Sequence, residues 1–536
     1  MTDRRTPRRV FAGLTLALFA AVCVAPLAAL AWRSLFEGGA WHLDAWRAVL
    51  AEPRQWTLLA NSLTVSLGTA AASLLVGGGA ALSLQYCPRL LRAPLAVLLC
   101  VPLLIPPYIF AVAWLDAMMR TGLLTPQFVA ESVVSPSFGL PSVILISTLS
   151  YYPIVLIFTG VALRRFDRRM LESARLIADP LQTFFVVRFP LCAPWVFTGA
   201  GFVFLLTLTE YSVPALFQVN VYPVEIFTEL SAFHEVGRAA ALVLPLLAAG
   251  AVVVWAWGRW ARPRQQWLSH SGRAVEGMPL GWKRTSLATA GCLGLAGLAL
   301  GAPVTLLAVR TGTLAQLETA WSDARQEILT SLLLSVCAAT LLTALGFAMA
   351  WLARDSARTA RLFHWSVVPF LITGPLLGTG LITLWNHPGP ALYVFETILV
   401  LVLACAAKYL YFAYQGERVA LQELHPRPLE AAQVYDIGWI RRGLRVAAPM
   451  TAPVRAAIWG FAFILSLREL EATAMLAPPG ITPLSIRIHS LMHYGPGAAV
   501  ASLCLLMTGL LLAAGCGTAV LYFTCRRVFH AYHQVR

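Results

Sequence analysis

The chain has 536 residues, of which 58% are apolar and only 12% are Asp, Glu, Lys or Arg. That charged fraction is about half of the usual value for soluble domains, which excludes a disordered chain and a water-soluble enzyme. The formal net charge of +15 does not indicate nucleic-acid binding, because the polar surface that would present a basic patch in water is missing. The positive residues instead predict membrane topology.

Windows of roughly 20 apolar residues with few charges predict twelve membrane-spanning helices. In chain order the windows lie near residues 10–32, 58–84, 93–115, 140–163, 191–217, 239–257, 285–309, 328–353, 362–385, 391–414, 452–476 and 498–524. The first window also resembles a secretory signal, since Arg8-Arg9 precede it and Ala29-Leu30-Ala31 resembles a cleavage site. A similar window recurs at the centre of the chain, which favours a membrane span and not a signal at the first window. The pattern predicts an all-α, polytopic membrane protein.

The distribution of positive residues predicts the orientation of the spans. Most of the 40 Lys and Arg residues fall at the N-terminus or in alternate segments between the windows. These segments cover residues 85–92, 164–190, 258–284, 353–361, 416–449 and 525–536. Placing them in the cytoplasm puts both termini inside, as an even number of spans requires.

Internal similarity predicts a duplicated chain. Gly201–Phe217 and Gly460–Leu476 share Gly-Phe-x-Phe and align Glu210 with Glu469, and APLAALAWR at residues 25–33 pairs with APVTLLAVR at residues 302–310. An even number of spans per repeat predicts parallel repeats, related by an axis along the membrane normal. The expected division is a first six-helix repeat at 1–257, a cytoplasmic linker at 258–284 and a second repeat at 285–536.

One predicted cytoplasmic loop in each half has an unusual pattern. In residues 164–190 and 423–449, a helix with Glu-(Ser/Ala)-Ala is followed by a turn, a second amphipathic helix and a proline. Asp179-Pro180 predicts the first turn, because the residue before proline avoids the α region. Ile437-Gly438 predicts the second turn, through the tolerance of glycine for positive φ.

These two loops resemble the EAA loops of ABC importer permeases, where the loop is a coupling helix that inserts into a groove of the ATPase subunit. The family pattern has a glycine four residues after the second alanine, where this chain has Asp436. The resemblance implies ATPase-coupling roles for Glu172, Ser173, Ala174, Asp179, Pro180 and Pro190 in the first loop, and for Glu430, Ala431, Ala432, Asp436, Gly438 and Pro449 in the second. The alternative is a pair of juxtamembrane helices held by anionic lipid through residues such as Arg164 and Arg165.

The resemblance implies the fold of type I ABC importer permeases, in the bacterial inner membrane. No Gly-Lys-Ser or Gly-Lys-Thr is present, so a P-loop is excluded. The chain is therefore expected to be a transport subunit without a cofactor, and not an enzyme. The implied partners are two copies of an ATPase that binds ATP and Mg²⁺, a periplasmic substrate-binding protein and the lipid bilayer, with no nucleic acid.

The segment LRELEATAML at residues 467–476, followed by Pro478-Pro479-Gly480, resembles a stretch of the fused ferric-iron permeases. The resemblance implies ferric iron as the solute. Importers of thiamine, phosphonate or polyamine share the same plan. An ion-gradient-driven secondary transporter with two parallel halves is the alternative from a different class.

Three acids lie in predicted spans, where a charge costs roughly 2.5 to 3.5 kcal/mol on insertion scales. Glu210 and Glu469 occupy matching places in the fifth and eleventh spans, and Glu471 follows two residues later. We expect these acids to line a permeation path. The alternatives are neutralisation by Arg468 or a position at the outer interface, within reach of water.

Other motifs predict packing and not chemistry. Ten cysteines occur without a CxxC pair, and His489 and His493 lack a nearby third ligand, so no metal site is expected. Gly77-Gly78-Gly79 predicts a close helix contact, since no lysine follows to complete a phosphate loop. Prolines in the third span and Gly374-Pro375 in the ninth predict kinks, for which packing is favoured over a gate.

Overall fold

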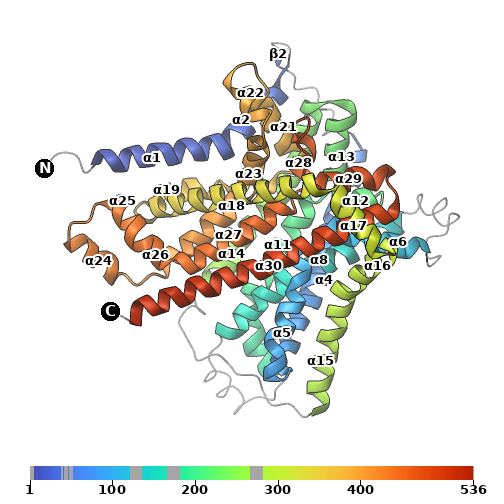
Figure 1. Ribbon diagram of the computed structural model, residues 1–536, viewed down its shortest axis with the longest axis horizontal. Coiled ribbons are helices and arrows are strands. Elements are labelled where there is room, and N and C mark those ends of the chain that lie inside the picture. The colour runs from blue at the N-terminus through green and yellow to red at the C-terminus, as the bar shows by residue number, and fades with distance from the viewer. Residues whose placement is uncertain are drawn as a thin grey trace. The chain divides into compact units, whose positions relative to one another are not determined.

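The computed structural model describes residues 5–37, 40–41, 46–47, 52–120, 136–165, 182–265 and 282–534 (Figure 1). Within these ranges the fold is helical, apart from a two-residue antiparallel ladder between β1 (Phe36–Glu37) and β2 (Ala40–Trp41). The predicted all-helical class is therefore confirmed.

The elements of the first half of the sequence are α1 (Arg5–Phe19), η1 (Ala20–Val24), α2 (Ala25–Leu35), α4 (Arg54–Tyr86), α5 (Arg89–Cys100), η2 (Val101–Leu104), α6 (Pro107–Arg120), α8 (Pro136–Arg165), η3 (Thr183–Arg188), α11 (Phe189–Thr209), α12 (Ser212–Leu216), α13 (Tyr222–Thr228), η4 (Glu229–Phe233) and α14 (Val236–Gln265). Those of the second half are α15 (Trp282–Ala296), η6 (Gly297–Gly301), α16 (Ala302–Thr311), α17 (Leu314–Asp323), α18 (Arg325–Arg354), α19 (Ala357–His364), α20 (Val367–Leu371), α21 (Gly374–Trp385), α22 (Pro390–Phe395), α23 (Ile398–Gln422), α24 (Arg427–Val434), α25 (Trp439–Arg442), η7 (Gly443–Ala447), α26 (Ala448–Met450), α27 (Ala452–Leu467), α28 (Glu471–Leu476), α29 (Leu484–Tyr494) and α30 (Gly497–Gln534).

The number of spans agrees with the prediction. Among the described residues, nine helices are long and apolar enough to cross a bilayer, and three bent helix pairs raise the number to twelve if each pair is one span. Every one of these twelve segments overlaps a predicted window. Long apolar runs are sufficient to predict such helices, because a backbone in hydrocarbon must satisfy its hydrogen bonds internally.

Three of the spans are sharply bent. Arg89–Leu104 meets Pro107–Met118 at 89°, Ala357–Leu371 meets Gly374–Trp385 at 110°, and Trp439–Met450 meets Ala452–Leu467 at 81°. In each pair the second helix has a proline in its first turn, where the missing N–H costs nothing. The kinks predicted in the third and ninth spans are confirmed, whereas the third bend lies just before the predicted eleventh window, which begins at residue 452.

The eleventh span also ends earlier than expected. The predicted window reaches residue 476, but α27 stops at Leu467, and α28 begins at Glu471 after a short non-helical joint. The fifth span has the same form, because α11 stops at Thr209 and α12 begins at Ser212. Apolar residues resume after both joints, so a long hydropathy window extends across them.

The described chain forms two compact units. Unit 1 comprises residues 1–46, 227–241 and 313–536, and unit 2 comprises residues 47–226 and 242–312. The first span, formed by α1, η1 and α2, thus packs within the unit that holds most of the second repeat. The seventh span, formed by α15, η6 and α16, packs within the unit that holds most of the first.

Side-chain contacts within each unit establish this exchange. In unit 1 the ring of Phe19 meets that of Phe363 edge to face, with 5.3 Å between the centroids. In unit 2 Arg310 Nε of the seventh span lies 3.4 Å from Asp116 Oδ1 of α6. The boundaries of the compact units therefore differ from those of the predicted repeats. The division at residues 258–284 stays a prediction from the internal repeat.

Both halves repeat the same hydrogen bond between distant segments. Ser62 Oγ accepts the backbone N–H of Tyr222 at 2.9 Å, and Ser331 Oγ accepts that of Leu484 at 2.7 Å. Ser62 and Ser331 lie on the second helix of each repeat, and all four residues are buried. A buried bond of this kind satisfies a backbone donor that has no water available, so its recurrence supports a two-half architecture.

A glycine in each half brings the second and fourth spans of that half together. A Cβ atom at Gly77 of α4 would lie 2.4 Å from the carbonyl oxygen of Tyr152 on α8. A Cβ at Gly346 of α18 would lie 2.9 Å from the carbonyl carbon of Ala413 on α23. Small residues permit such backbone contact between membrane helices. The close contact predicted for the glycine run is confirmed at Gly77.

Candidate functional sites

The loop at residues 423–449 contains a short helix with one buried edge. Helix α24 begins just after Pro426, where a proline is well tolerated. Leu429 and Ala432, three residues apart and therefore on one side of the helix, are buried. Leu429 belongs to the hydrophobic core of unit 1. The sequence thus forms a helix here that is anchored along one edge only; Figure 1 labels this helix at the left of the view.

The end of α24 is a Schellman motif. The N–H of Asp436 donates to Gln433 O, and the N–H of Ile437 donates to Ala432 O, both at 3.0 Å. This motif requires a left-handed residue just after the helix, and Asp436 has φ of 56°. The sequence-based prediction placed the turn at Ile437-Gly438, but Gly438 has φ of −56°. The left-handed residue is Asp436, because the helix ends two residues earlier than expected.

The outward side of α24 carries small, charged and apolar side chains together. Glu430 and Ala431 are exposed, and Glu430 lies in the first turn, where a carboxylate interacts favourably with the helix dipole. At the other end, Val434 is 85% exposed and Tyr435 is 82% exposed. No side chain in the described part of the molecule covers this tip. Exposed apolar groups at the end of a helix that is anchored along one edge are typical of a protein contact.

The segment after α24 is held by a cluster at the N-terminal end of the first span. Trp439 Nε1 donates to Asp355 Oδ2 at 2.8 Å, and Arg8 donates to the same oxygen at 3.0 Å. The Arg8 guanidinium also lies 5.1 Å from the centre of the Trp439 ring. Beside this cluster is a cavity of about 260 Å³, lined mainly by apolar side chains that include Phe11 and Trp351. The base of the loop is therefore packed against the first span.

The remaining predicted loop residues have different outcomes. Pro449 lies in the first turn of α26 and Pro190 in the first turn of α11. Neither proline marks the start of a helix, because α26 follows α25 and η7 without a break and α11 follows η3 without a break. Other residues of the first loop lie outside the described part of the chain: Glu172, Ser173, Ala174, Asp179 and Pro180. Their role stays a prediction.

Glu210 lies at the joint between α11 and α12, in unit 2. It has an extended backbone, with φ of −73° and ψ of 125°, and is 7% exposed. Its Oε1 accepts the backbone N–H of Ser212 at 3.0 Å and the Ser212 hydroxyl, and its Oε2 accepts the hydroxyl of Tyr151 at 3.0 Å. The first N–H groups of α12 have no carbonyl of a preceding helical turn to bind. The carboxylate supplies an acceptor for one of them, as a helix start in hydrocarbon requires.

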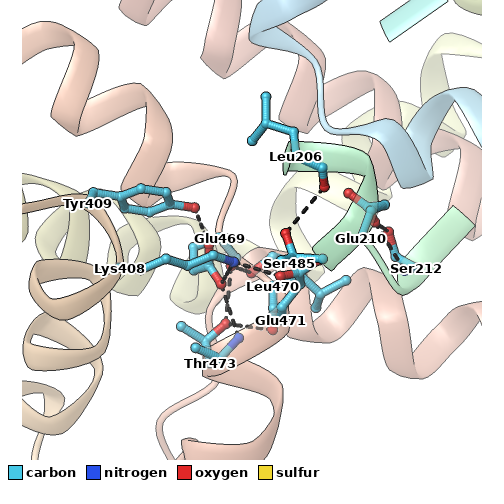
Figure 2. A network of polar contacts seen from close by, with 12 residues as sticks. Leu206, Glu210, Ser212, Lys408, Tyr409, Glu469, Leu470, Glu471, Thr473 and Ser485 are labelled. Carbon is cyan, nitrogen blue, oxygen red and sulfur yellow. Dashed lines mark hydrogen bonds and ion pairs between the residues drawn. The ribbon is translucent and has the colours of Figure 1, made fainter. Parts of the chain in front are cut away.

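Glu469 occupies the equivalent joint between α27 and α28, in unit 1, and is 3% exposed. Its Oε1 accepts the backbone N–H of Ala472 at 3.0 Å, and its Oε2 accepts the hydroxyl of Tyr409. Figure 2 shows Lys408 Nζ between two carboxylates, 3.0 Å from Glu469 Oε1 and 2.7 Å from Glu471 Oε2. The second half therefore has a buried cluster of one base and two acids.

Lys408 and Tyr409 were not predicted as site residues from the sequence. The alternative considered was neutralisation by Arg468, whereas in the structure Lys408 pairs with both acids. A signal was present, because Lys408 is a lysine inside a span and such a charge needs a partner. Within the described ranges, no group of three His, Cys, Asp or Glu is placed to hold a metal ion. His489 and His493 lie ring to ring at 5.0 Å.

Comparison with known proteins identifies relatives of one kind. No model of a known protein family matches the chain. The chain is 23% identical over 450 residues to the Fe(3+)-transport system permease protein FbpB 2 of Haemophilus influenzae, and the alignment covers 82% of this chain and 85% of that protein. It is 29% identical over 218 residues to the molybdenum transport system permease protein ModB of Mycobacterium tuberculosis, covering 38% of this chain and 81% of ModB.

A third relative has the same partial coverage. The chain is 26% identical over 219 residues to the putative 2-aminoethylphosphonate transport system permease protein PhnU of Salmonella typhimurium, covering 39% of this chain and 77% of PhnU. Less than half of this chain thus aligns with most of the length of ModB or PhnU, whereas the FbpB alignment extends over most of this chain. Two permease-sized halves in one chain explain both alignments.

Proposed function

This chain is a permease subunit of a binding-protein-dependent ABC importer, and from that premise we propose that it moves ferric iron across the bacterial inner membrane. It is a multi-pass transport subunit and not an enzyme. The observation that carries the proposal of iron is the alignment with the FbpB ferric-iron permease over 82% of the chain. The molybdenum and 2-aminoethylphosphonate permeases align over less than half of it. Thiamine and polyamine remain alternative solutes of the same plan.

We propose that α24 is the coupling helix of the second half. Its exposed face and its uncovered apolar tip, Val434 and Tyr435, support docking on an ATPase subunit. A separate ATPase would bind ATP and Mg²⁺, and its second copy would dock on the loop at residues 164–190. Movement of the ATPase subunits would then be transmitted through Trp439 to the first span. A periplasmic binding protein would deliver the solute on the other side.

We assign Glu210, Glu469 and Glu471 to the neighbourhood of the permeation path. All three lie at the joints of broken spans, where membrane transporters use irregular backbone beside a cavity. Their hydrogen bonds also give them a structural role, because each joint needs acceptors for its N–H groups. The positive-inside distribution of Lys and Arg supports the proposal that both termini are cytoplasmic.

Co-purification tests the coupling proposal. The double variant Val434→Asp/Tyr435→Asp places two charges in the proposed apolar contact and should lose the ATPase encoded with the permease, while its thermal unfolding stays unchanged. Leu314→Asp is the matched control, because Leu314 is 85% exposed on α17, far along the chain from the loop. If the double variant still captures the ATPase, α24 is a lipid-facing helix and not a coupling helix.

Transport in proteoliposomes tests the solute and the energy source. With the ATPase and the binding protein present, we expect ATP-dependent uptake of radioactive ferric iron that molybdate and 2-aminoethylphosphonate do not compete with. Competition by either compound would reassign the solute. Uptake that continues without ATP but stops when ion gradients collapse would identify a secondary transporter.

A further inference from the structure

The two broken spans share a tyrosine–glutamate contact. The hydroxyl of Tyr151 on α8 donates to Glu210 at 3.0 Å, and the hydroxyl of Tyr409 on α23 donates to Glu469. Both tyrosines come from the fourth span of their repeat, and both glutamates from the joint after the fifth. The contact therefore belongs to the duplicated plan, and it allows the residues around each site to be compared position by position.

Two of the differences between the sites change the charged side chains around the glutamate. In the first half, the residue before the tyrosine and the residue two places after the glutamate are Ser150 and Ser212. In the second half they are Lys408 and Glu471. The two differences are linked in space, because Lys408 Nζ lies 2.7 Å from Glu471 Oε2 (Figure 2).

The exchange also preserves the charge of the site. Ser150 is neutral and donates to the carbonyl of Ile146 in its own helix at 3.1 Å, so Glu210 is the one charged residue among Ser150, Tyr151, Glu210 and Ser212. In the second network Lys408 cancels one of its two glutamates, so that a single negative charge again remains. Losing either Lys408 or Glu471 alone would change the net charge of this buried cluster, which is energetically unfavourable.

We propose that Lys408 and Glu471 form an ionic lock, exchanged as a unit for the two serines of the other half, which positions Glu469 and ties α28 to α23. Because Lys408 bridges both carboxylates, it also offsets the repulsion between Glu469 and Glu471. The lock makes the second joint stiffer than the first, so the two halves of the permease are mechanically unequal. This role of Lys408 as a positioning residue rests on the proposed function only in that Glu469 is assigned to the path.

The residues of the first half provide the test. In the second half the variants are Lys408→Ser, Glu471→Ser and the double variant Lys408→Ser/Glu471→Ser. The reverse exchange is made in the first half, with Ser150→Lys, Ser212→Glu and the double variant Ser150→Lys/Ser212→Glu. Two quantities are measured: the unfolding temperature of the purified permease in detergent, and ATP hydrolysis per folded permease–ATPase complex. Each single variant should lower the unfolding temperature by several degrees and reduce hydrolysis several-fold. Each double variant should regain most of both losses.

Two results would overturn the lock. One is a double variant Lys408→Ser/Glu471→Ser that loses as much as the two single variants together, which would mean that the residues act independently. The other is a pair of single variants that both behave as the wild type. The unfolding temperature is measured on the permease alone, so it tests the lock even if no ATPase binds. Failure of the wild-type permease to bind an ATPase would reject the proposed function and not the lock.

Discussion

Asp436 is the left-handed residue at the turn after α24. The residue after α24 must adopt the left-handed conformation, because its N–H and the next N–H cap the helix by the Schellman pattern. Glycine takes this conformation without steric cost, and aspartate is among the few other residues that tolerate it. The substitution at this position therefore keeps the geometry of the turn.

Replacement of Asp436 should show this requirement. Asp436→Gly should keep the stability within about 1 kcal/mol, because relief of the left-handed strain is opposed by the greater freedom of glycine in the unfolded chain. Asp436→Val should lose about 1 to 2 kcal/mol, because a β-branched residue is unfavourable at positive φ. Thermal unfolding in detergent and ATPase capture measure the two effects. Equal stability of the valine variant and the wild type would contradict the assigned turn.

His489 provides a pH-dependent contribution to stability. It lies on α29, outside the spans, and burial, aided by the neighbouring His493, lowers its pKa to about 4. In the unfolded chain the pKa is about 6.5. As the pH falls below that value the unfolded chain binds a proton that the folded protein excludes, so stability is full above pH about 6.5 and declines toward pH about 4.

The unfolding temperature measured across this pH window tests the assignment. We expect His489→Gln to flatten the decline, whereas His493→Gln, at an exposed neighbouring position, should leave most of it in place. A pH profile that is the same in His489→Gln and in the wild type would show that other groups cause the decline.

At the scale of elements, helix contacts depend on single glycines. Gly77 and Gly78 are adjacent on α4, but only Gly77 faces the backbone of α8. Gly77→Ala should cost about 2 kcal/mol or more, because its Cβ would lie 2.4 Å from a carbonyl oxygen that cannot easily move. Gly78→Ala is the matched control, since a Cβ there meets nothing within 4 Å. Unfolding temperatures that fall equally in both variants would contradict this packing.

Prediction of the elements succeeded where local composition decides the structure. All twelve windows correspond to helices or bent pairs, because a long apolar run in lipid has few alternatives to helix. The joints after Thr209 and Leu467 were missed. Each joint depends on hydrogen bonds from a tyrosine on another span, which a pattern within one segment does not contain.

At the scale of the whole molecule, the first span packs with the second repeat. Phe19, which is buried, is part of the same hydrophobic core as Phe363 and residues of α18 and α23. Phe19→Ala should therefore destabilise unit 1 by about 3 kcal/mol. Leu18→Ala is the control, because Leu18 on the same helix is 48% exposed. If thermal unfolding does not distinguish the two variants, the exchange of first spans is not part of the stable core.

The candidate sites show the same division between local and distant information. The helix–turn–helix pattern of the second loop was predictable, because it depends on residues close in sequence. The pairing of Lys408 with Glu469 and Glu471 was not, because these residues are 61 and 63 positions apart. A lysine in a span indicates that a partner exists, but not which of several acids it meets.

Local sequence sufficed for the all-helical class, the number of spans and the helix of the second loop, since each depends on apolar runs or on residues close in the chain. Only the three-dimensional packing revealed the exchanged first spans, the broken joints and the buried Lys408 cluster. The physical reason is that these features arise from contacts between helices, and their energy depends on which faces meet, which no single segment of the chain specifies.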